Sequence, residues 1–355
     1  MHMMGTALGM FFPRLAERLP QTGIADLPTP LREYAFTTTP APHTVLVKHD
    51  DLSSKLYGGN KIRKLEFILR RAMDRGAERV ATFGAVASNH ALATALFAQQ
   101  LGLGCTCFLS HQSKTPQAPL ALNMHLLLGT EIVRFGGDRS DRVQTLRRYL
   151  QQRRSWVIPM GGSSWLGVVG FVNAGLELAL QLSAEHIAPP DRLYVANGTM
   201  GTAAGIALGL ALAGLATEVQ AVRVTHEQVA NRAAMQRLLQ KAAGMMRGLD
   251  ASVPADIAAQ VRLNWRDEFF AGGYAHSDAA TENAMALAHA DLGITLDSTY
   301  SGKAMAALLS DAADPRYAGQ SRLFWNTYNS RVLPVSPLRP ADVSGLPPEF
   351  LRYYV

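Results

Sequence analysis

The hydrophobic pattern of the chain alternates between short apolar runs and longer helical stretches. The short runs are rich in β-branched and aromatic residues and are bounded by polar or turn residues, as buried strands are. The longer stretches place apolar residues three and four positions apart, or are apolar throughout. The predicted strands cover residues 44–48, 79–83, 105–109, 131–135, 156–159, 192–196, 219–224 and 323–325, and the clearest helices cover 61–75, 89–101, 116–127, 141–153 and 203–215.

This alternation predicts an α/β fold class. Strands that alternate with helices form βαβ units, which build open and mostly parallel twisted sheets with helices on both faces. Such sheets bind their ligands beyond the carboxyl ends of the strands. The glycine-rich and polar segments of this chain follow predicted strands, so we expect the functional residues at those ends.

Bulk properties narrow the class of function. At 355 residues the chain is long enough to form two lobes around a shared cleft. The net charge of +6 is spread over short arginine clusters, and no basic run is interleaved with aromatic residues. We therefore expect no nucleic-acid partner, and the positive charge favours an anionic substrate or cofactor.

Cysteine usage and hydropathy indicate a soluble, cytoplasmic protein. Cys105 and Cys107, two apart in a predicted strand, form neither a disulfide framework nor a zinc pattern, so no metal is expected. The apolar residues 8–12 are too few to span a membrane and lack a charged segment before them. The apolar stretch 203–216 has the length of a core helix.

A lysine directly after two glycines is the clearest chemical signal. In Gly58-Gly59-Asn60-Lys61 the glycines permit a tight turn and Asn60 is a good helix N-cap. Lys61 is therefore expected at a helix N-terminus, where the helix dipole and Lys64, one turn on, both favour the neutral amine. A neutral amine can form an imine with an aldehyde. Taken alone, the segment also fits a capped surface helix with ordinary lysines.

A second glycine-rich segment has the features of a phosphate site. Residues 197–205, Asn-Gly-Thr-Met-Gly-Thr-Ala-Ala-Gly, join a predicted strand to a helix, whose first backbone amides can converge on an anion. Thr199 and Thr202 add hydroxyl donors. Gly198, Gly201 and Gly205 do not follow the Gly-x-Gly-x-x-Gly order of a dinucleotide fold. A plain strand-to-helix turn gives the same local pattern.

Three more segments complete a family pattern: Ser88-Asn89-His90, Pro159–Ser164 and Asp297–Met305. Together with the two glycine-rich segments they resemble, in order and spacing, the pyridoxal-phosphate family of D-cysteine desulfhydrase and 1-aminocyclopropane-1-carboxylate deaminase. The resemblance extends from about residue 27 to 325. It implies a tryptophan-synthase-β-like fold (fold type II), a homodimer, and a discontinuous large domain of residues 1–64 and 161–355 with a small domain of residues 65–160.

The resemblance also implies roles for individual residues. Lys61 would carry pyridoxal 5′-phosphate as an imine and, once freed by the substrate, would remove the α-proton. The other catalytic residues would be Ser88, Tyr274 and Tyr300. Cofactor contacts would come from Lys64, Asn89, Gly198, Thr199, Met200, Gly201, Thr202 and Ser301, and substrate contacts from Ser88, Asn89, His90, Trp165, Tyr274 and Tyr300.

Ser301 distinguishes between two reactions of this family. The residue at this position faces the ring nitrogen, and it is Glu in the deaminases and a hydroxyl residue in the desulfhydrases. A carboxylate keeps the nitrogen protonated, whereas a hydroxyl leaves it largely neutral. A neutral ring suffices when a good leaving group departs from the β-carbon. Ser301 therefore favours β-elimination over cyclopropane ring opening.

Several positions depart from the family pattern. Met200 stands where the family usually has Gly, and Leu92-Ala93 where it commonly has Arg-Gln. Residues 326–330, Asn-Thr-Tyr-Asn-Ser, replace a His-Thr-Gly-Gly segment beside the cofactor ring, which would narrow the pocket, shift the loop or add polar contacts. Trp165 is larger than the usual residue. These changes indicate retained chemistry and a substrate different from D-cysteine.

The sequence therefore predicts a pyridoxal-phosphate-dependent lyase acting on a small amino acid. The expected reaction is α,β-elimination of a β-substituted, D-cysteine-like substrate to a 2-oxo acid, ammonia and the leaving group. Three alternatives remain open: 1-aminocyclopropane-1-carboxylate deamination, a racemase or β-replacement synthase on the same fold, and a non-catalytic cofactor-binding protein.

Overall fold

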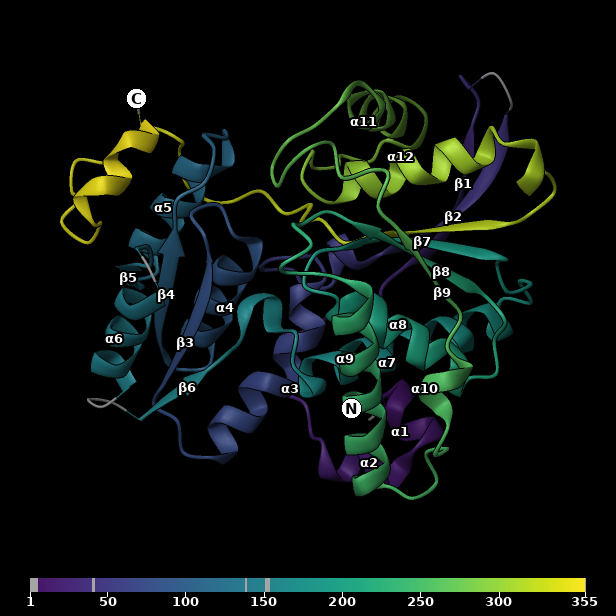
Figure 1. Cartoon of the computed structure of the whole chain (residues 1–355), viewed down its shortest axis with the longest axis horizontal. Helices are drawn as coiled ribbons and strands as arrows, with labels where there is room; N and C mark the ends of the chain where they lie inside the picture. The colour runs from purple at the N-terminus through teal and green to yellow at the C-terminus, as the bar shows by residue number, and fades with distance from the viewer. Residues whose placement is uncertain (1–5, 40–41, 138, 151–153, 355) are drawn as a thin grey trace. The chain divides into compact units, whose positions relative to one another are not determined.

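The computed structural model describes the chain except for residues 1–5, 40–41, 138, 151–153 and 355. Its elements form two compact units, each with its own sheet (Figure 1). The larger unit comprises residues 1–67 and 163–331, and the smaller unit comprises residues 68–162 and 332–355. The chain passes from one unit to the other within helix α3 (Lys61–Asp74), after Gly162 and after Arg331.

The larger unit is built on a six-stranded sheet of order β1-β2-β10-β7-β8-β9. Strand β1 pairs antiparallel with β2, and the other pairs are parallel. Figure 1 shows α11 and α12 on one face of this sheet and α7, α8 and α9 on the other. The strands are β1 (Leu31–Phe36), β2 (His43–His49), β7 (Arg192–Asn197), β8 (Glu218–Arg223), β9 (Leu263–Arg266) and β10 (Arg322–Asn326). The helices are α1 (Ala7–Phe11), α2 (Pro13–Arg18), α7 (Trp165–Ala184), α8 (Gly201–Leu212), α9 (Arg232–Leu249), α10 (Ile257–Gln260), α11 (Ala279–Leu292) and α12 (Ser301–Ala312), with short 3₁₀ turns η1 (Asp50–Leu52) and η3 (Pro315–Tyr317).

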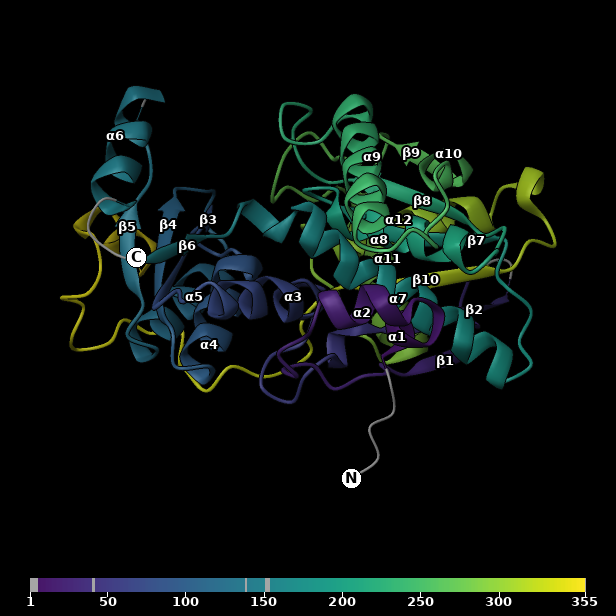
Figure 2. The ribbon, with the colours of Figure 1, turned by 90° about the horizontal axis from the view of Figure 1, so that it is seen from below.

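The smaller unit has a four-stranded parallel sheet of order β5-β4-β3-β6. Figure 2 shows this sheet between α6 on one side and α4 and α5 on the other, as right-handed crossovers require. Its elements are β3 (Arg79–Ala85), α4 (Asn89–Gln100), β4 (Gly104–Ser110), α5 (Gln117–Leu127), β5 (Glu131–Arg134), α6 (Arg139–Leu150), β6 (Ser155–Val157), η2 (Met160–Gly162) and η4 (Pro348–Tyr354).

The predicted α/β fold class is confirmed, and each predicted strand has a counterpart in one of the two sheets. The sequence pattern missed β1 and β9. The burial pattern of β1 does not alternate, because only its two end residues are buried, and β9 has only four residues. The last three residues of the helix predicted at 141–153 lie outside the described residues.

The C-terminal segment differs from the predicted domain assignment. Residues 332–355 group with the smaller unit, whereas the sequence prediction placed them in the larger domain. Side-chain hydrogen bonds hold the segment there. The Tyr353 hydroxyl accepts from the backbone N–H of Gln112 at 2.9 Å, and Asn123 Nδ2 donates to the Ser336 carbonyl at 2.6 Å. The proline-rich composition of this segment gives no sign of these contacts.

Helix α7 is long and apolar enough, by length and composition alone, to cross a membrane. Its mean hydropathy is 1.4, and 78% of the apolar window is buried inside the structure. The helix contacts α8 along its length, and its one buried carboxylate, Glu177, is paired with cations. These are the properties of a core helix.

A buried ion network fixes the start of α3 within the larger unit. Arg63 donates from Nε and Nη2 to both carboxylate oxygens of Asp50, at 2.8–3.0 Å, and also binds Glu177 at 2.8 Å. Lys48 Nζ binds Glu177 at 2.6 Å, and Trp325 Nε1 donates to Asp50 at 2.8 Å. Burial alone would raise the pKa of Glu177, but Arg63 and Lys48 lower it to about 2. The network joins β2, η1, α3, α7 and β10.

We expect Arg63→Met to destabilise the protein strongly. It leaves Asp50 without a cationic partner in the core, and breaking a buried ion pair from one side typically costs about 3–5 kcal/mol. Arg70→Met is the matched control, since Arg70 lies on the same helix in an exposed pair with Asp74 and should cost at most ~0.5 kcal/mol. Urea unfolding followed by circular dichroism measures both, and equal shifts in the two midpoints would contradict the prediction.

Candidate active site

Lys61 is the first residue of α3, and its amine is held by its neighbour. Lys61 Nζ donates to Asn60 Oδ1 at 2.7 Å, while Asn60 Nδ2 donates to Thr202 Oγ1 at 2.9 Å. The Asn60 amide therefore connects the lysine to the glycine-rich segment that precedes α8. Lys61 Nζ also lies 5.9 Å from the centre of the Tyr300 ring. The predicted juxtaposition of these three motifs is present in the larger unit.

The environment of Lys61 makes its amine easier to deprotonate. Burial lowers the pKa of Lys61 from 10.5 to about 8, although the carboxylate of Asp297 acts in the opposite direction. Burial also lowers the pKa of Lys64 well below its usual value, and the charge of Lys61 adds to that effect. Desolvation, rather than the helix dipole invoked from the sequence, is the main cause for both lysines.

The two glycines before Lys61 are required by close backbone contacts. A Cβ atom on Gly58 would lie 1.7 Å from the carbonyl oxygen of Asp51. Gly59 has a φ of +99°, and a Cβ there would lie 3.0 Å from the Thr327 carbonyl oxygen. No side chain fits at either position without moving the backbone. The loop that presents Lys61 is therefore enclosed by η1 on one side and the end of β10 on the other.

The glycine-rich segment forms a polar cradle around Gly201. Ser163 Oγ lies 2.7 Å from Thr199 Oγ1, accepts from Gly201 N–H at 3.2 Å, and receives a hydrogen bond from Lys64 Nζ at 3.2 Å. A Cβ on Gly201 would be only 2.7 Å from Ser163 Oγ and 3.0 Å from Lys64 Nζ. The N-terminus of the twelve-residue α8 adds its partial positive charge. The donor set suits a phosphate dianion.

Met200 occupies a backbone conformation that normally belongs to glycine. Its φ and ψ of 68° and −26° are left-handed, which costs a side-chain-bearing residue about 1–3 kcal/mol. The family pattern has Gly here, so the structure explains that preference. Because the backbone keeps the left-handed turn, the loop retains its path despite the substitution.

Four tyrosines share with Lys61 an electrostatic interaction with Asp297: Tyr57, Tyr274, Tyr300 and Tyr328. Tyr274 and Tyr300 hydroxyls lie 2.6 Å apart, with their rings edge to face. Burial raises the pKa of both phenols, and it does the same for Tyr57 and Tyr328. The charge of Asp297 raises all four further. At neutral pH these groups therefore hold their protons and can act as hydrogen-bond donors.

Ser301 is completely buried and its hydroxyl is engaged by Asp297. Ser301 Oγ donates to Asp297 Oδ1 at 2.5 Å and accepts from the Asp297 backbone N–H at 2.9 Å. The same carboxylate accepts from the backbone N–H groups of Thr299, Tyr300 and Ser301, so it caps α12. Ser301 is part of this cap, and its predicted position opposite a ring nitrogen stays a prediction.

The remaining predicted residues are described by their contacts within their own units. Ser88 caps α4 by accepting from Ala91 N–H at 3.2 Å, and Asn89 is the first residue of that helix. His90 is 3% exposed, with Nε2 at 2.9 Å from Thr82 Oγ1 inside the smaller unit. Trp165 begins α7 and is half-buried. The substrate contacts assigned to these four residues stay predictions.

Sequence reasoning assigned no site role to three residues that the structure brings to this site, Asn60, Ser163 and Tyr57, and it noted Tyr328 only as a departure beside the cofactor ring. Ser163 carries a recognisable signal, because it directly follows Gly161-Gly162 at the entry to a helix. Asn60 was interpreted only as a helix cap. Neither tyrosine has a local pattern that distinguishes it from a core tyrosine.

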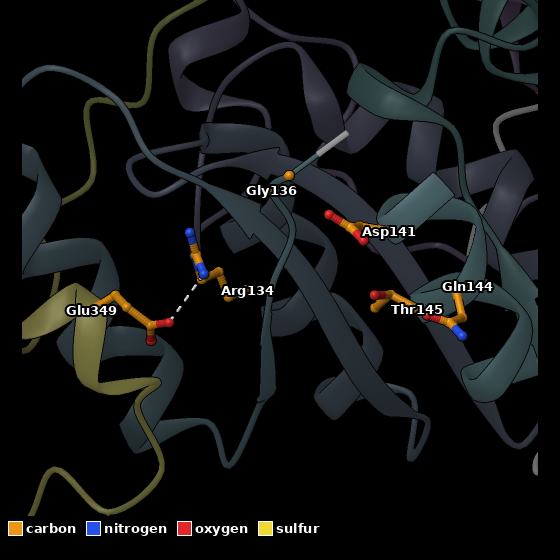
Figure 3. A pocket seen from close by; sticks show the side chains of 7 residues that line it. Arg134, Gly136, Asp141, Gln144, Thr145 and Glu349 are labelled. Atoms are coloured by element: carbon orange, nitrogen blue, oxygen red, sulfur yellow. Dashed lines mark hydrogen bonds and ion pairs between the residues drawn. The ribbon is translucent and has the colours of Figure 1, made fainter. Parts of the chain in front are cut away.

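A separate hollow of about 550 Å³ lies in the smaller unit (Figure 3). It is lined by Arg134, Gly136, Gly137, Asp141, Gln144, Thr145 and Glu349, and Arg134 Nη1 pairs with Glu349 at 3.2 Å. None of the lysine, glycine-loop or tyrosine residues line it. It is not part of the site described above.

The sequence model of the pyridoxal-phosphate dependent enzymes matches residues 24–324. The chain belongs to this family. It is 33% identical over 308 residues to the D-cysteine desulfhydrase of Salmonella paratyphi B, covering 84% of this chain and 90% of that protein. The structure of an ACC deaminase homologue matches with a TM-score of 0.74 and 27% identity, covering 92% and 95% of the two chains. The fungal L-serine ammonia-lyase of Rhizomucor miehei, at 17% identity, TM-score 0.60 and coverage of 94% and 99%, shares the fold.

The residues present fit pyridoxal phosphate. Lys61 offers an amine of lowered pKa to the aldehyde, and Lys64, Ser163 and the N-terminus of α8 offer donors to the phosphate. A Cβ on Gly201 would collide with Ser163 Oγ and Lys64 Nζ, so glycine at this position lets both polar groups approach the start of α8 closely, as a phosphate cradle requires.

We expect Gly201→Asp to weaken cofactor binding without unfolding the protein. The added carboxylate would enter the cradle and repel the phosphate by on the order of 2 kcal/mol, which is roughly a thirtyfold rise in Kd. Gly244→Asp is the control, because Gly244 is exposed on α9 and a Cβ there meets nothing within 4 Å. Absorbance titration of the apoprotein with pyridoxal phosphate gives Kd, and an unchanged value for Gly201→Asp would place the phosphate elsewhere.

Proposed function

We propose that this protein is a lyase that catalyses α,β-elimination on a small β-substituted amino acid such as D-cysteine. The products would be a 2-oxo acid, ammonia and the β-substituent. The D-cysteine desulfhydrases at 33% identity support this choice. The proposal includes a cytoplasmic homodimer with no nucleic-acid or membrane partner.

The main observation behind the proposal is the contrast between the lowered pKa of the Lys61 amine and the raised pKa values of the nearby phenols. The Lys61 amine has a pKa of about 8, lowered by burial, so a useful fraction is neutral near pH 7. The four phenols that interact with the same carboxylate, Asp297, have raised pKa values and stay protonated. In the described part of the larger unit, Lys61 is therefore the group best suited to act as the base, and the tyrosines supply donors.

The residues would divide the reaction as follows. Pyridoxal phosphate, when bound, withdraws electrons from the substrate's α-carbon and makes its proton acidic. Lys61 Nζ would take that proton, and Asn60 Oδ1 would keep the amine oriented. The paired hydroxyls of Tyr274 and Tyr300 would donate to the departing β-substituent and stabilise its negative charge. Lys64, Ser163 and the start of α8 would hold the phosphate.

Ser301 favours elimination over deamination of 1-aminocyclopropane-1-carboxylate. The position has no carboxylate side chain of its own, and ring opening needs a stronger electron sink than loss of a good leaving group. Racemisation would need a second base, and the raised pKa values of the tyrosines argue against a phenolate in that role. Binding without catalysis is disfavoured because Lys61 and its partners are in place.

We expect the attachment of pyridoxal phosphate to the apoprotein to depend on pH through Lys61. Below pH 8 the protonated amine predominates, so the attachment rate should fall about tenfold per pH unit and level off above pH 8. Borohydride reduction followed by peptide mass spectrometry should place the adduct on Lys61. Lys61→Ala should lose the adduct, and Lys64→Ala should retain it on Lys61. An adduct found on Lys64 in the unaltered protein would disprove the assignment.

We expect D-cysteine to release pyruvate, sulfide and ammonia in equal amounts. The assay should be run in parallel with L-cysteine, D-serine and 1-aminocyclopropane-1-carboxylate, with Lys61→Ala as the blank. Release of 2-oxobutyrate from the cyclopropane substrate at a rate matching or exceeding elimination would favour the deaminase instead. Inversion of an amino acid without keto acid would favour a racemase.

A further inference from the structure

The segment that departs most from the family pattern lies against the loop that presents Lys61. Residues 327–331, here called the strap, follow β10 and belong to the larger unit. The Asn60 backbone N–H donates to the Thr327 carbonyl at 3.2 Å, and the Gly58 N–H donates to Asn329 Oδ1 at 2.7 Å. These contacts fall one and three residues before Lys61.

The amide of Asn329 uses both ends of its side chain. Oδ1 accepts from Arg331 N–H at 3.0 Å as well as from Gly58, and Nδ2 donates to the Arg331 carbonyl at 2.9 Å. The orientation of the amide is therefore fixed by the strap itself, and its oxygen points at the Gly58 peptide. A glycine, which the family pattern has here, could supply none of these bonds.

The Gly58 backbone also contacts η1. A Cβ on Gly58 would lie 1.7 Å from Asp51 O, so the loop is in direct contact with this turn. Ser330 Oγ binds Asp51 Oδ2 at 2.7 Å, which ties the strap to the same turn. Gly58 therefore contacts both Asp51 and Asn329. Movement of this peptide would shift Asn60, whose side chain binds Lys61 Nζ and Thr202.

We propose that Asn329 is a positioning residue that holds the Gly58–Asn60 loop so that the Asn60 amide stays against the Lys61 amine. This rests on Lys61 being the cofactor lysine. Without the Asn329 bond the loop moves away from the strap and Lys61 becomes more exposed to water, so its amine titrates at higher pH. Asn329 itself does not contact the reacting atoms.

The test compares Asn329→Ala with Ser330→Ala, which removes the side-chain bond of the strap to Asp51 but keeps the Asn329 bond to Gly58 and the backbone bond from Ser330 N–H to the Asp51 carbonyl. In the apoprotein, the pH midpoint for attachment of pyridoxal phosphate should rise by at least about half a unit in Asn329→Ala, which is roughly a threefold slower rate at pH 7. Ser330→Ala should keep the midpoint of the unaltered protein. Equal midpoints in all three proteins would overturn the proposal.

Hydrogen–deuterium exchange of the peptide containing Gly58 gives a readout independent of the cofactor. Exchange should be faster in Asn329→Ala than in Ser330→Ala. Asn329→Asp keeps an acceptor for the Gly58 and Arg331 N–H groups and should retain slow exchange, which also tests the idea if Asn329→Ala does not fold. Fast exchange in Asn329→Asp would contradict it. Failure of the cofactor assignment would give a different result from failure of the Asn329 proposal, because the unaltered protein would then carry the cofactor on another lysine.

Discussion

The pairing of Arg63 with Asp50 and Glu177 is the constraint on which the site depends. Each of these three charged residues would be costly to bury alone. The bidentate bonds of Arg63 to Asp50, and its further bond to Glu177, fix the direction of the guanidinium. Arg63 lies two residues after Lys61 on the same helix turn. Fixing one therefore fixes the backbone of the other, and the Gly59 N–H bond to Asp50 O extends the constraint to the loop before it. The network therefore positions the Lys61 backbone as well as stabilising the fold.

The electrostatics of the site follow from this rigid placement. Lys61 is half-buried and Lys64, one turn on, is buried, and the nearby carboxylate, Asp297, already accepts four hydrogen bonds from residues 299–301. Desolvation and the charge of Lys61 lower the pKa of Lys64. Desolvation also lowers the pKa of Lys61, which keeps its amine partly neutral and able to react. One arrangement thus favours both anchoring of the phosphate and attack on the aldehyde.

The sequence predicted the parts of the fold and site that local chemistry determines. The glycine turns, the lysine at a helix start and the strand-to-helix loop all have local signals, and the structure brings Lys61, Thr202 and Tyr300 together. Strands β1 and β9 lacked a periodic pattern, since edge pairing rather than alternation defines them. The bonds of Asn60 to Thr202 and of Tyr353 to Gln112 link segments that are distant in the sequence. The bond of Ser301 to Asp297 is formed within one helix cap. No local pattern specifies which partner such polar side chains choose.

The strap shows how a family pattern can change at the site while the lysine keeps its place. Tyr328 and Asn329 replace two glycines of the family pattern. Judged by side-chain size alone, this change should crowd the pocket. Asn329 instead forms a closed set of hydrogen bonds with its own backbone and with Gly58. Tyr328 becomes a fourth protonated phenol beside Tyr57. We infer that this polar anchoring maintains the backbone at Lys61, and we propose that the added ring of Tyr328 alters which substrate is accepted. On this proposal, adjacent positions of one loop serve chemistry and specificity separately.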